Sequence, residues 1–219
     1  FTVSHKEMAF GGGMAVAMLA LTTILLIIDL ERPERFLRII VRPQMKSWIT
    51  RGAFILITFT SVAGAWWALE LATSLEWIGP DLIGRFRMPL AVITLPLGVA
   101  TAVYTAFLFA QCKGRDLWQT PLLAPHLIVQ AIMIGSAAVL AFSAFFEAGL
   151  IGAATTIFTG GLVVDLIIIL AGEFGVSHAT DTARRAAHDI THGEYKKIFW
   201  GGAIILGHIV PFGLMMIGG

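Results

Sequence analysis

The stretch Asp-Leu-Glu-Arg-Pro-Glu-Arg-Phe at residues 29–36 separates two long apolar segments. No charged residue occurs in residues 8–28, and a second apolar segment begins at Gly52. Pro33 prevents the first helix from continuing regularly, because its ring removes a backbone donor and clashes with the preceding turn. The pattern predicts a chain that leaves a membrane at Asp29 and enters it again after a charged loop.

The composition extends this prediction to the whole chain. Of 219 residues, 57% are hydrophobic and 13% charged, and the mean hydropathy is +0.84, outside the range of soluble domains. We therefore predict an all-α, polytopic transmembrane helical bundle that forms one integral membrane domain over residues 1–219. Each span has the roughly 20 residues that a bilayer requires. The six predicted spans are residues 8–30, 52–75, 88–110, 121–146, 148–175 and 198–217.

A family resemblance rests on the loop and on motifs elsewhere in the chain. The order of residues 29–36, Arg42-Pro43 and Ser47-Trp48 resembles the NrfD/PsrC family, the membrane subunits of polysulfide-reductase-type complexes. The chain departs from the family's usual pattern at Glu31, where the family has Gly, and in the Lys46-Ser47-Trp48 entry to the next helix. Further matches are Tyr104-Thr105, the segment from Pro121 to His126, and Phe199-Trp200-Gly201-Gly202.

The resemblance implies a function and a set of partners. Such proteins exchange electrons between menaquinone or ubiquinone and an extrinsic ferredoxin-like iron-sulfur subunit, which is often joined to a molybdopterin-containing catalytic subunit. They commonly have eight or more helices. Because the chain begins at Phe1 and ends at Gly219 directly after a span, we expect a fragment of a protein built of two four-helix bundles, with one further helix at each end.

Quinone chemistry requires a pocket reachable from lipid, donors for two carbonyl oxygens, and groups that exchange protons. The helix ends on the Asp29 side carry suitable side chains at comparable depth. Other roles stay open: an interfacial anchor for Tyr104, a helix-end histidine for His126, and an ion pair between Asp29 and Arg32. The predicted quinone-binding residues are Asp29, Arg32, Trp48, Arg51, Tyr104 and His126.

Ionisable residues inside the spans predict a polar route through the membrane. A charge in hydrocarbon costs at least about 2.5 kcal/mol on insertion scales, so such residues need partners, water or neutral forms. Asp165 and Glu173 are separated by about 12 Å of helix rise, whereas His208 on the next helix can reach Asp165. An interhelical clasp without proton transport is the alternative. The predicted proton-pathway residues are Glu70, Asp165, Glu173 and His208.

Cofactors of this chain are limited by its cysteine and histidine content. Cys112 is the only cysteine, so the chain by itself forms neither a disulfide nor a cysteine-ligated iron-sulfur cluster. A haem of a b-type cytochrome needs facing histidines at one depth, and we place His208 near mid-span but His126 near a helix end. We predict no haem, no metal site and no catalytic residue of its own, and leave a b-type cytochrome anchor and a proton-coupled transporter as alternatives.

The positive charges predict the orientation. Twelve Lys and Arg residues lie in or beside the three loops on the Asp29 side, and three lie on the other side. The positive-inside rule then places the Asp29 loop in the cytoplasm of a bacterial or archaeal cell, with the chain in the cytoplasmic membrane. Lipid is an expected partner and nucleic acid is not.

Overall fold

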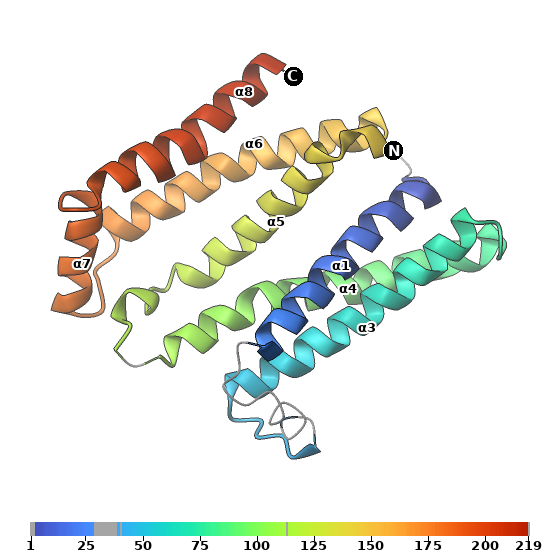
Figure 1. Ribbon diagram of the computed structural model, residues 1–219, viewed down its shortest axis with the longest axis horizontal. Helices are drawn as coiled ribbons and strands as arrows, with labels where there is room; N and C mark the ends of the chain where they lie inside the picture. The colour runs from blue at the N-terminus through green and yellow to red at the C-terminus, as the bar shows by residue number, and fades with distance from the viewer. Residues whose placement is uncertain (1–2, 29–38, 40, 113, 219) are drawn as a thin grey trace. The chain divides into compact units, whose positions relative to one another are not determined.

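A computed structural model describes residues 3–28, 39, 41–112 and 114–218 (Figure 1). The described residues form helices and turns, and no strand occurs among them, which confirms the all-α prediction. The long helices are α1 (His5–Ile28), α3 (Trp48–Ser74), α4 (Pro80–Ala110), α5 (Leu123–Ala141) and α6 (Ala148–Leu170). The shorter elements are the 3-10 turns η2 (Asp116–Trp118) and η3 (Ser143–Phe145), the π-helices η4 (Ala171–Gly175) and η5 (Ile198–Ile209), and the α-helices α7 (Asp181–Thr191) and α8 (Val210–Gly218).

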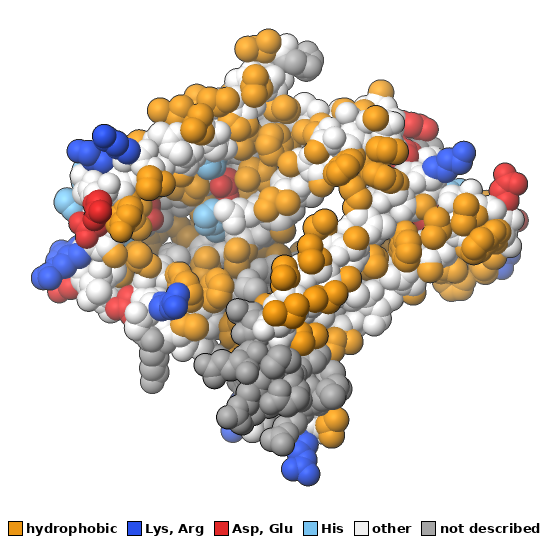
Figure 2. All heavy atoms as spheres, in the orientation of Figure 1, with side chains coloured by type: hydrophobic (Ala, Val, Ile, Leu, Met, Phe, Trp, Pro, Cys, Tyr) orange, Lys and Arg blue, Asp and Glu red, His pale blue; other side chains and the backbone are white. Residues whose placement is uncertain are grey.

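Six helices in the described part of the chain are long and apolar enough to cross a membrane, as the sequence predicted. Their ends differ in places from the predicted ends. The third spanning helix begins at Pro80 instead of Met88, because proline is favoured at the start of a helix and the charged side chains between them do not prevent helix formation. Large apolar side chains are exposed along the spanning helices, and on the face shown in Figure 2 they cover much of the helix surface.

The chain divides into two compact units, Phe1–Thr105 and Ala106–Gly219. In the first unit, α1 lies beside α3 (Figure 1). Gly12 and Gly13 of α1 face Trp67 of α3, where an added Cβ would come within 3.5 and 3.0 Å of the tryptophan side chain. These glycines are a packing seam, since small residues let helices approach closely in a membrane.

The turn between α3 and α4 has a defined C-terminal cap. The Trp77 amide donates to the Ala72 carbonyl (2.9 Å) and the Glu76 amide to that of Thr73 (3.1 Å), as in a Schellman motif. Glu76 has a φ of 61°, in the left-handed region that this motif requires. The motif ends α3 and reverses the chain into α4.

In the second unit, α6 packs against α5 and against η5 and α8 (Figure 1). An added Cβ on Gly161 of α6 would meet Met133 of α5 at 3.3 Å, so this helix pair is also close. The segment between the predicted spans at 148–175 and 198–217 contains the short helix α7. Thr180 caps it by accepting from the Ala183 amide (3.1 Å), and Trp200 Nε1 donates to the carbonyl of Thr191 (3.0 Å) at its end.

Candidate functional site

The second unit contains a buried carboxylate between two histidines. Asp165 on α6 has an exposed fraction of only 2%. Its Oδ2 lies 3.0 Å from Nε2 of His208 on η5, and its Oδ1 lies 3.0 Å from Nε2 of His126 on α5. We call these three residues the Asp165 cluster. The hydrogen bond expected between Asp165 and His208 is therefore present, and His126 is an additional neighbour that the sequence prediction missed.

The position of one proton on His208 follows from its other ring nitrogen. Nδ1 lies 2.7 Å from the carbonyl oxygen of Ala203, five residues earlier in the π-helix. A carbonyl oxygen only accepts hydrogen bonds, so Nδ1 carries a proton and donates it. The π-helical turn therefore fixes the ring so that Nε2 faces Asp165. π-helical segments occur frequently at functional sites.

His126 is held less firmly. Its Nε2 lies 3.1 Å from the side-chain amide nitrogen of Gln130, one turn further along α5. The contact with Asp165 Oδ1 is equally short but lacks the alignment of a hydrogen bond, and this oxygen has no hydrogen-bond partner among the described residues. One nitrogen of His126 thus faces both an amide and a carboxylate oxygen.

From the sequence we placed His126 near a helix end and His208 near mid-span, and the structure agrees: His126 is in the first turn of α5 and His208 is in the middle of the last span. Both nevertheless contact the same carboxylate of Asp165. Their different places along the helices therefore do not keep the two histidines apart, and this argument against a haem histidine pair does not hold.

The first unit contains a second buried carboxylate, Glu70 of α3, which is 1% exposed. Arg87 of α4 donates from Nε to Oε1 (2.7 Å) and from a terminal nitrogen to Oε2 (2.9 Å). Trp66 Nε1 donates to Oε1 (3.1 Å), and His5 Nδ1 of α1 lies 2.7 Å from Oε2. We call these four residues the Glu70 cluster. It joins α1, α3 and α4.

The two oxygens of Glu70 therefore have several donors, which stabilises the ionised carboxylate. Arg87 also donates to the carbonyl oxygen of Val3 (3.0 Å), so its guanidinium is held in turn. Glu70 was predicted for a proton pathway, but this geometry favours a fixed charge. The sequence could have predicted Arg87 as the partner of Glu70, because Glu70 lies near the end of one predicted span and Arg87 directly before the next.

Glu173, also predicted for the proton pathway, lies in η4. Its Oε2 is buried and has no hydrogen-bond partner among the described residues. No hydrogen bond or ion pair between described side chains joins it to Asp165, His126 or His208. The structure therefore does not bring it into the Asp165 cluster.

The predicted quinone residues fall in different parts of the chain. Asp29 and Arg32 lie outside the described residues. The guanidinium carbon of Arg51 lies 4.8 Å from the centre of the Trp48 ring, and Nε of Arg51 donates to the Met45 carbonyl (2.6 Å). These contacts fix the guanidinium at the start of α3.

Tyr104 of α4 packs against the same turn of α3. An added Cβ on Gly52 would overlap the Tyr104 ring at Cδ2 and Cε2, so only glycine permits this approach. The tyrosine is 9% exposed, and no hydrogen bond joins its hydroxyl to another described residue. Tyr104 and Arg51 are thus brought to one level of the first unit, whereas His126 belongs to the second.

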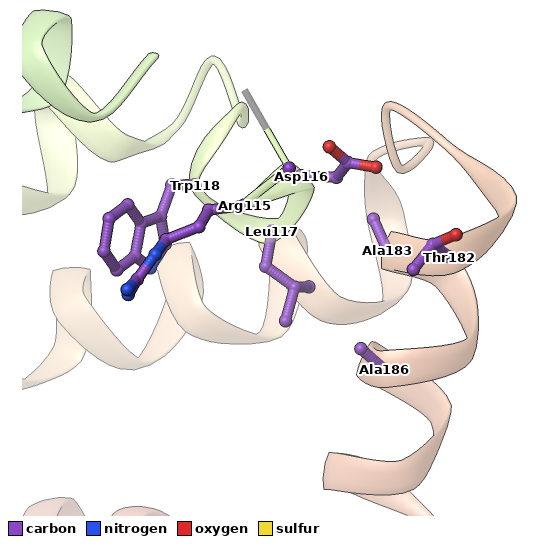
Figure 3. A pocket seen from close by; sticks show the side chains of 8 residues that line it. Arg115, Asp116, Leu117, Trp118, Thr182, Ala183 and Ala186 are labelled. Carbon is purple, nitrogen blue, oxygen red and sulfur yellow. The ribbon is translucent and has the colours of Figure 1, made fainter. Parts of the chain in front are cut away.

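A pocket of about 360 Å³ lies in the second unit between the segment at 114–118 and α7 (Figure 3). Arg115 stacks over Trp118 at 4.5 Å, and Asp116 accepts a hydrogen bond from Thr180 (2.6 Å). None of the predicted site residues lines it. The described residues contain no group of three or more His, Cys, Asp or Glu side chains that could hold a metal ion.

Comparisons with known proteins identify the family. The model of the family described as "Polysulphide reductase, NrfD" matches residues 4–217, nearly the whole chain. The chain belongs to the NrfD family. This NrfD-family protein is an integral membrane protein, as its six apolar helices also indicate.

One relative, from Halobacterium salinarum, is described as a putative membrane subunit of dimethyl sulfoxide reductase. It is 28% identical over 127 residues, which cover 51% of this chain and 29% of the relative. The matched part therefore spans less than a third of the relative's length. No solved structure matches the chain.

Proposed function

We propose that this chain is the quinone-interacting membrane subunit of a multi-subunit respiratory oxidoreductase. It exchanges electrons between the membrane quinone pool and an extrinsic iron-sulfur subunit, itself joined to a molybdenum-containing catalytic subunit. The observation that carries the proposal is the family match over residues 4–217. The description of the relative as a membrane subunit of a reductase supports the same assignment.

The division of labour follows from the cysteine content. Cys112 is the only cysteine of the chain, so iron-sulfur clusters ligated by cysteines belong to another subunit. Menaquinone or ubiquinone supplies the two-electron and two-proton chemistry when bound. The chain's own residues then bind and orient the ring and move protons.

The residues of the first unit fit a quinone head group. A quinone carbonyl oxygen accepts hydrogen bonds, and the Tyr104 hydroxyl is a donor that no other described residue uses. Its ring is held against Gly52, so the hydroxyl direction is fixed by packing. Arg51 directly precedes Gly52, and its guanidinium is held by the Trp48 ring and the Met45 carbonyl. It supplies positive charge at the same end of α3 as Tyr104. Asp29, Arg32 and His126 remain predicted quinone-binding residues.

Tyr104→Phe in the intact complex tests the proposal. The variant keeps the ring that packs on Gly52 and removes only the hydroxyl. Loss of a hydrogen bond to the bound ring costs about 1 to 3 kcal/mol, so quinol turnover should slow by about one to two decades. Assembly, measured by gel filtration and subunit identification, should be unchanged.

Tyr195→Phe is the matched control, because it makes the same change at the only other tyrosine, which is 51% exposed. It should turn over quinol at the wild-type rate. Wild-type quinol kinetics in Tyr104→Phe would move the quinone site away from this tyrosine. Copurification of the tagged chain without any iron-sulfur subunit would contradict the proposed partners.

A further inference from the structure

We infer that the Asp165 cluster is a binding site for two protons, one held between Asp165 and His208 and a second taken up between His126 and Asp165. The inference deepens the proposed function, because quinone reactions release or consume protons. The inference rests on the proposed function only in the experiment that measures quinol turnover.

The first proton follows from the ring orientation of His208. Its Nδ1 carries a proton because its partner is the Ala203 carbonyl, 2.7 Å away. In a neutral ring, Nε2 then has a lone pair, and it faces a carboxylate oxygen at 3.0 Å. Two acceptors at that distance need a proton between them. Whether this proton lies on Asp165 or on His208, the pair as a whole is neutral, which suits its burial.

The second position lies on the other side of the carboxylate. Nε2 of His126 is 3.0 Å from Oδ1, which has no hydrogen-bond partner among the described residues. A proton added to this nitrogen would have Oδ1 of Asp165 as its acceptor. The structure therefore shows the first position bonded and the second ready to accept.

Gln130 acts as a positioning residue for His126. Its amide lies 3.1 Å from the same Nε2, so it bonds this nitrogen while the second proton is absent. When Nε2 of His126 takes up a proton, it becomes a donor and can no longer accept from the Gln130 amide. It then donates to Oδ1 of Asp165. Uptake adds one proton to the His126 ring and release removes it, with no electron transferred.

The second proton exchanges through His126. The His126 side chain is 25% exposed, against 8% for His208 and 2% for Asp165. Among the described residues, the titratable groups within ion-pair distance of Asp165 are these two histidines, from α5 and η5. Glu173 continues the same helix about 12 Å further along and is not joined to them.

The first experiment uses infrared spectroscopy on the purified complex and requires no quinone turnover. Titration over about pH 5 to 8, the range in which histidine usually changes charge, should change imidazole and carboxyl bands. Because the chain has four other histidines, the cluster is read from the bands that change in the wild type and not in Asp165→Asn. Wild-type titration spectra identical to those of Asp165→Asn would overturn the proton site, whatever the outcome of the quinol assay.

The second experiment measures proton movement and electron transfer in the same sealed vesicles. Asp165→Asn should lower the number of protons moved per quinol, because an amide does not release a proton at physiological pH. In the infrared titration, Gln130→Leu should bind the second proton about three- to tenfold more tightly, because it removes the hydrogen bond that the unprotonated nitrogen loses on uptake. Gln111→Leu, the same change at an exposed glutamine directly after α4, should match the wild type.

An unaltered proton-to-electron ratio in Asp165→Asn, together with wild-type proton affinity in Gln130→Leu, would leave the cluster as an interhelical clasp and overturn the inference. If Asp165→Asn fails to assemble, Gln130→Leu and the wild-type infrared titration still decide the question. Absence of quinol turnover in the wild-type complex would contradict the proposed function instead, and the infrared result would stand independently.

Discussion

Glu70 and Asp165 are the two most buried carboxylates among the described residues, one in each unit, and their neighbours differ in kind. Glu70 is 1% exposed and is paired with Arg87, whose guanidinium stays charged at any physiological pH. Asp165 is 2% exposed and has two histidines as neighbours, whose ring nitrogens can both accept and donate a proton. Burial therefore does not by itself assign a proton role. The chemistry of the partner decides between a fixed charge and an exchangeable proton.

The bonding of the two clusters shows the same difference. Both oxygens of Glu70 have at least two nitrogen neighbours at 2.7–3.1 Å. In the Asp165 cluster, Oδ2 is hydrogen-bonded and Oδ1 is not. The Glu70 cluster is saturated with donors, and the Asp165 cluster retains an unused acceptor.

The largest effect is expected for Glu70→Gln. The substitution leaves the charge of Arg87 without its counterion and should cost about 3 kcal/mol in the free energy of unfolding. This is the lower end for a buried pair, because Arg87 keeps 30% of its side chain exposed. Thermal unfolding of the purified protein in detergent measures it.

The double variant Glu70→Leu with Arg87→Met is the control for this cluster. It removes both charges and replaces them with apolar side chains of similar size, so it should recover most of the stability lost in Glu70→Gln. A Glu70→Gln variant as stable as the wild type would remove the structural contrast between the two clusters.

The same carboxylate-to-amide change in the second unit should cost much less. In Asp165→Asn the new amide donates to Nε2 of His208, which has no proton of its own when Nδ1 bonds the Ala203 carbonyl. The expected loss of stability is about 1 kcal/mol or less. Thermal unfolding beside Glu70→Gln gives the comparison directly. A loss as large as that of Glu70→Gln would mean that Asp165 is a fixed charge too.

The sequence predicted the helices well because the membrane imposes a simple requirement. Backbone groups in hydrocarbon must be bonded internally, so long apolar segments become helices. Their ends were less accurate. Residues 80–87 contain three charged side chains and were left outside the predicted span, although Pro80 and the residues after it start α4. The short helix α7 was missed, because its polar surface gives no hydropathy signal.

The candidate sites were predicted only in part because their partners come from distant segments. An acid inside a span requires a partner, and this requirement predicted the contact between Asp165 and His208 but not the one with His126. His126 is in the first turn of α5, and its position in the sequence does not show that this turn faces Asp165 of α6. The orientation of His208 depends on a π-helix, and none of the residue patterns used for the prediction signals one.

The smallest effect is expected at the turn that leads from the Glu70 helix to the Arg87 helix. Glu76 has a φ of 61°, and a left-handed conformation costs a non-glycine residue about 1 to 2 kcal/mol. Glycine avoids this cost but loses about 0.5 to 1 kcal/mol through its greater freedom in the unfolded chain. Glu76→Gly should therefore stabilise the protein by about 0.5 kcal/mol, a rise of about 1 to 2 °C in melting temperature.

Glu76→Ala separates the backbone effect from the loss of the charge. Alanine has the same Cβ as glutamate and meets the same left-handed cost, so this variant should melt at the wild-type temperature. Equal stabilisation by both variants would assign the gain to removal of the carboxylate. If neither variant is more stable, the turn does not limit the stability of the first unit. The contrast between the two clusters would then rest on Arg87 and its contacts with Glu70 and the Val3 carbonyl.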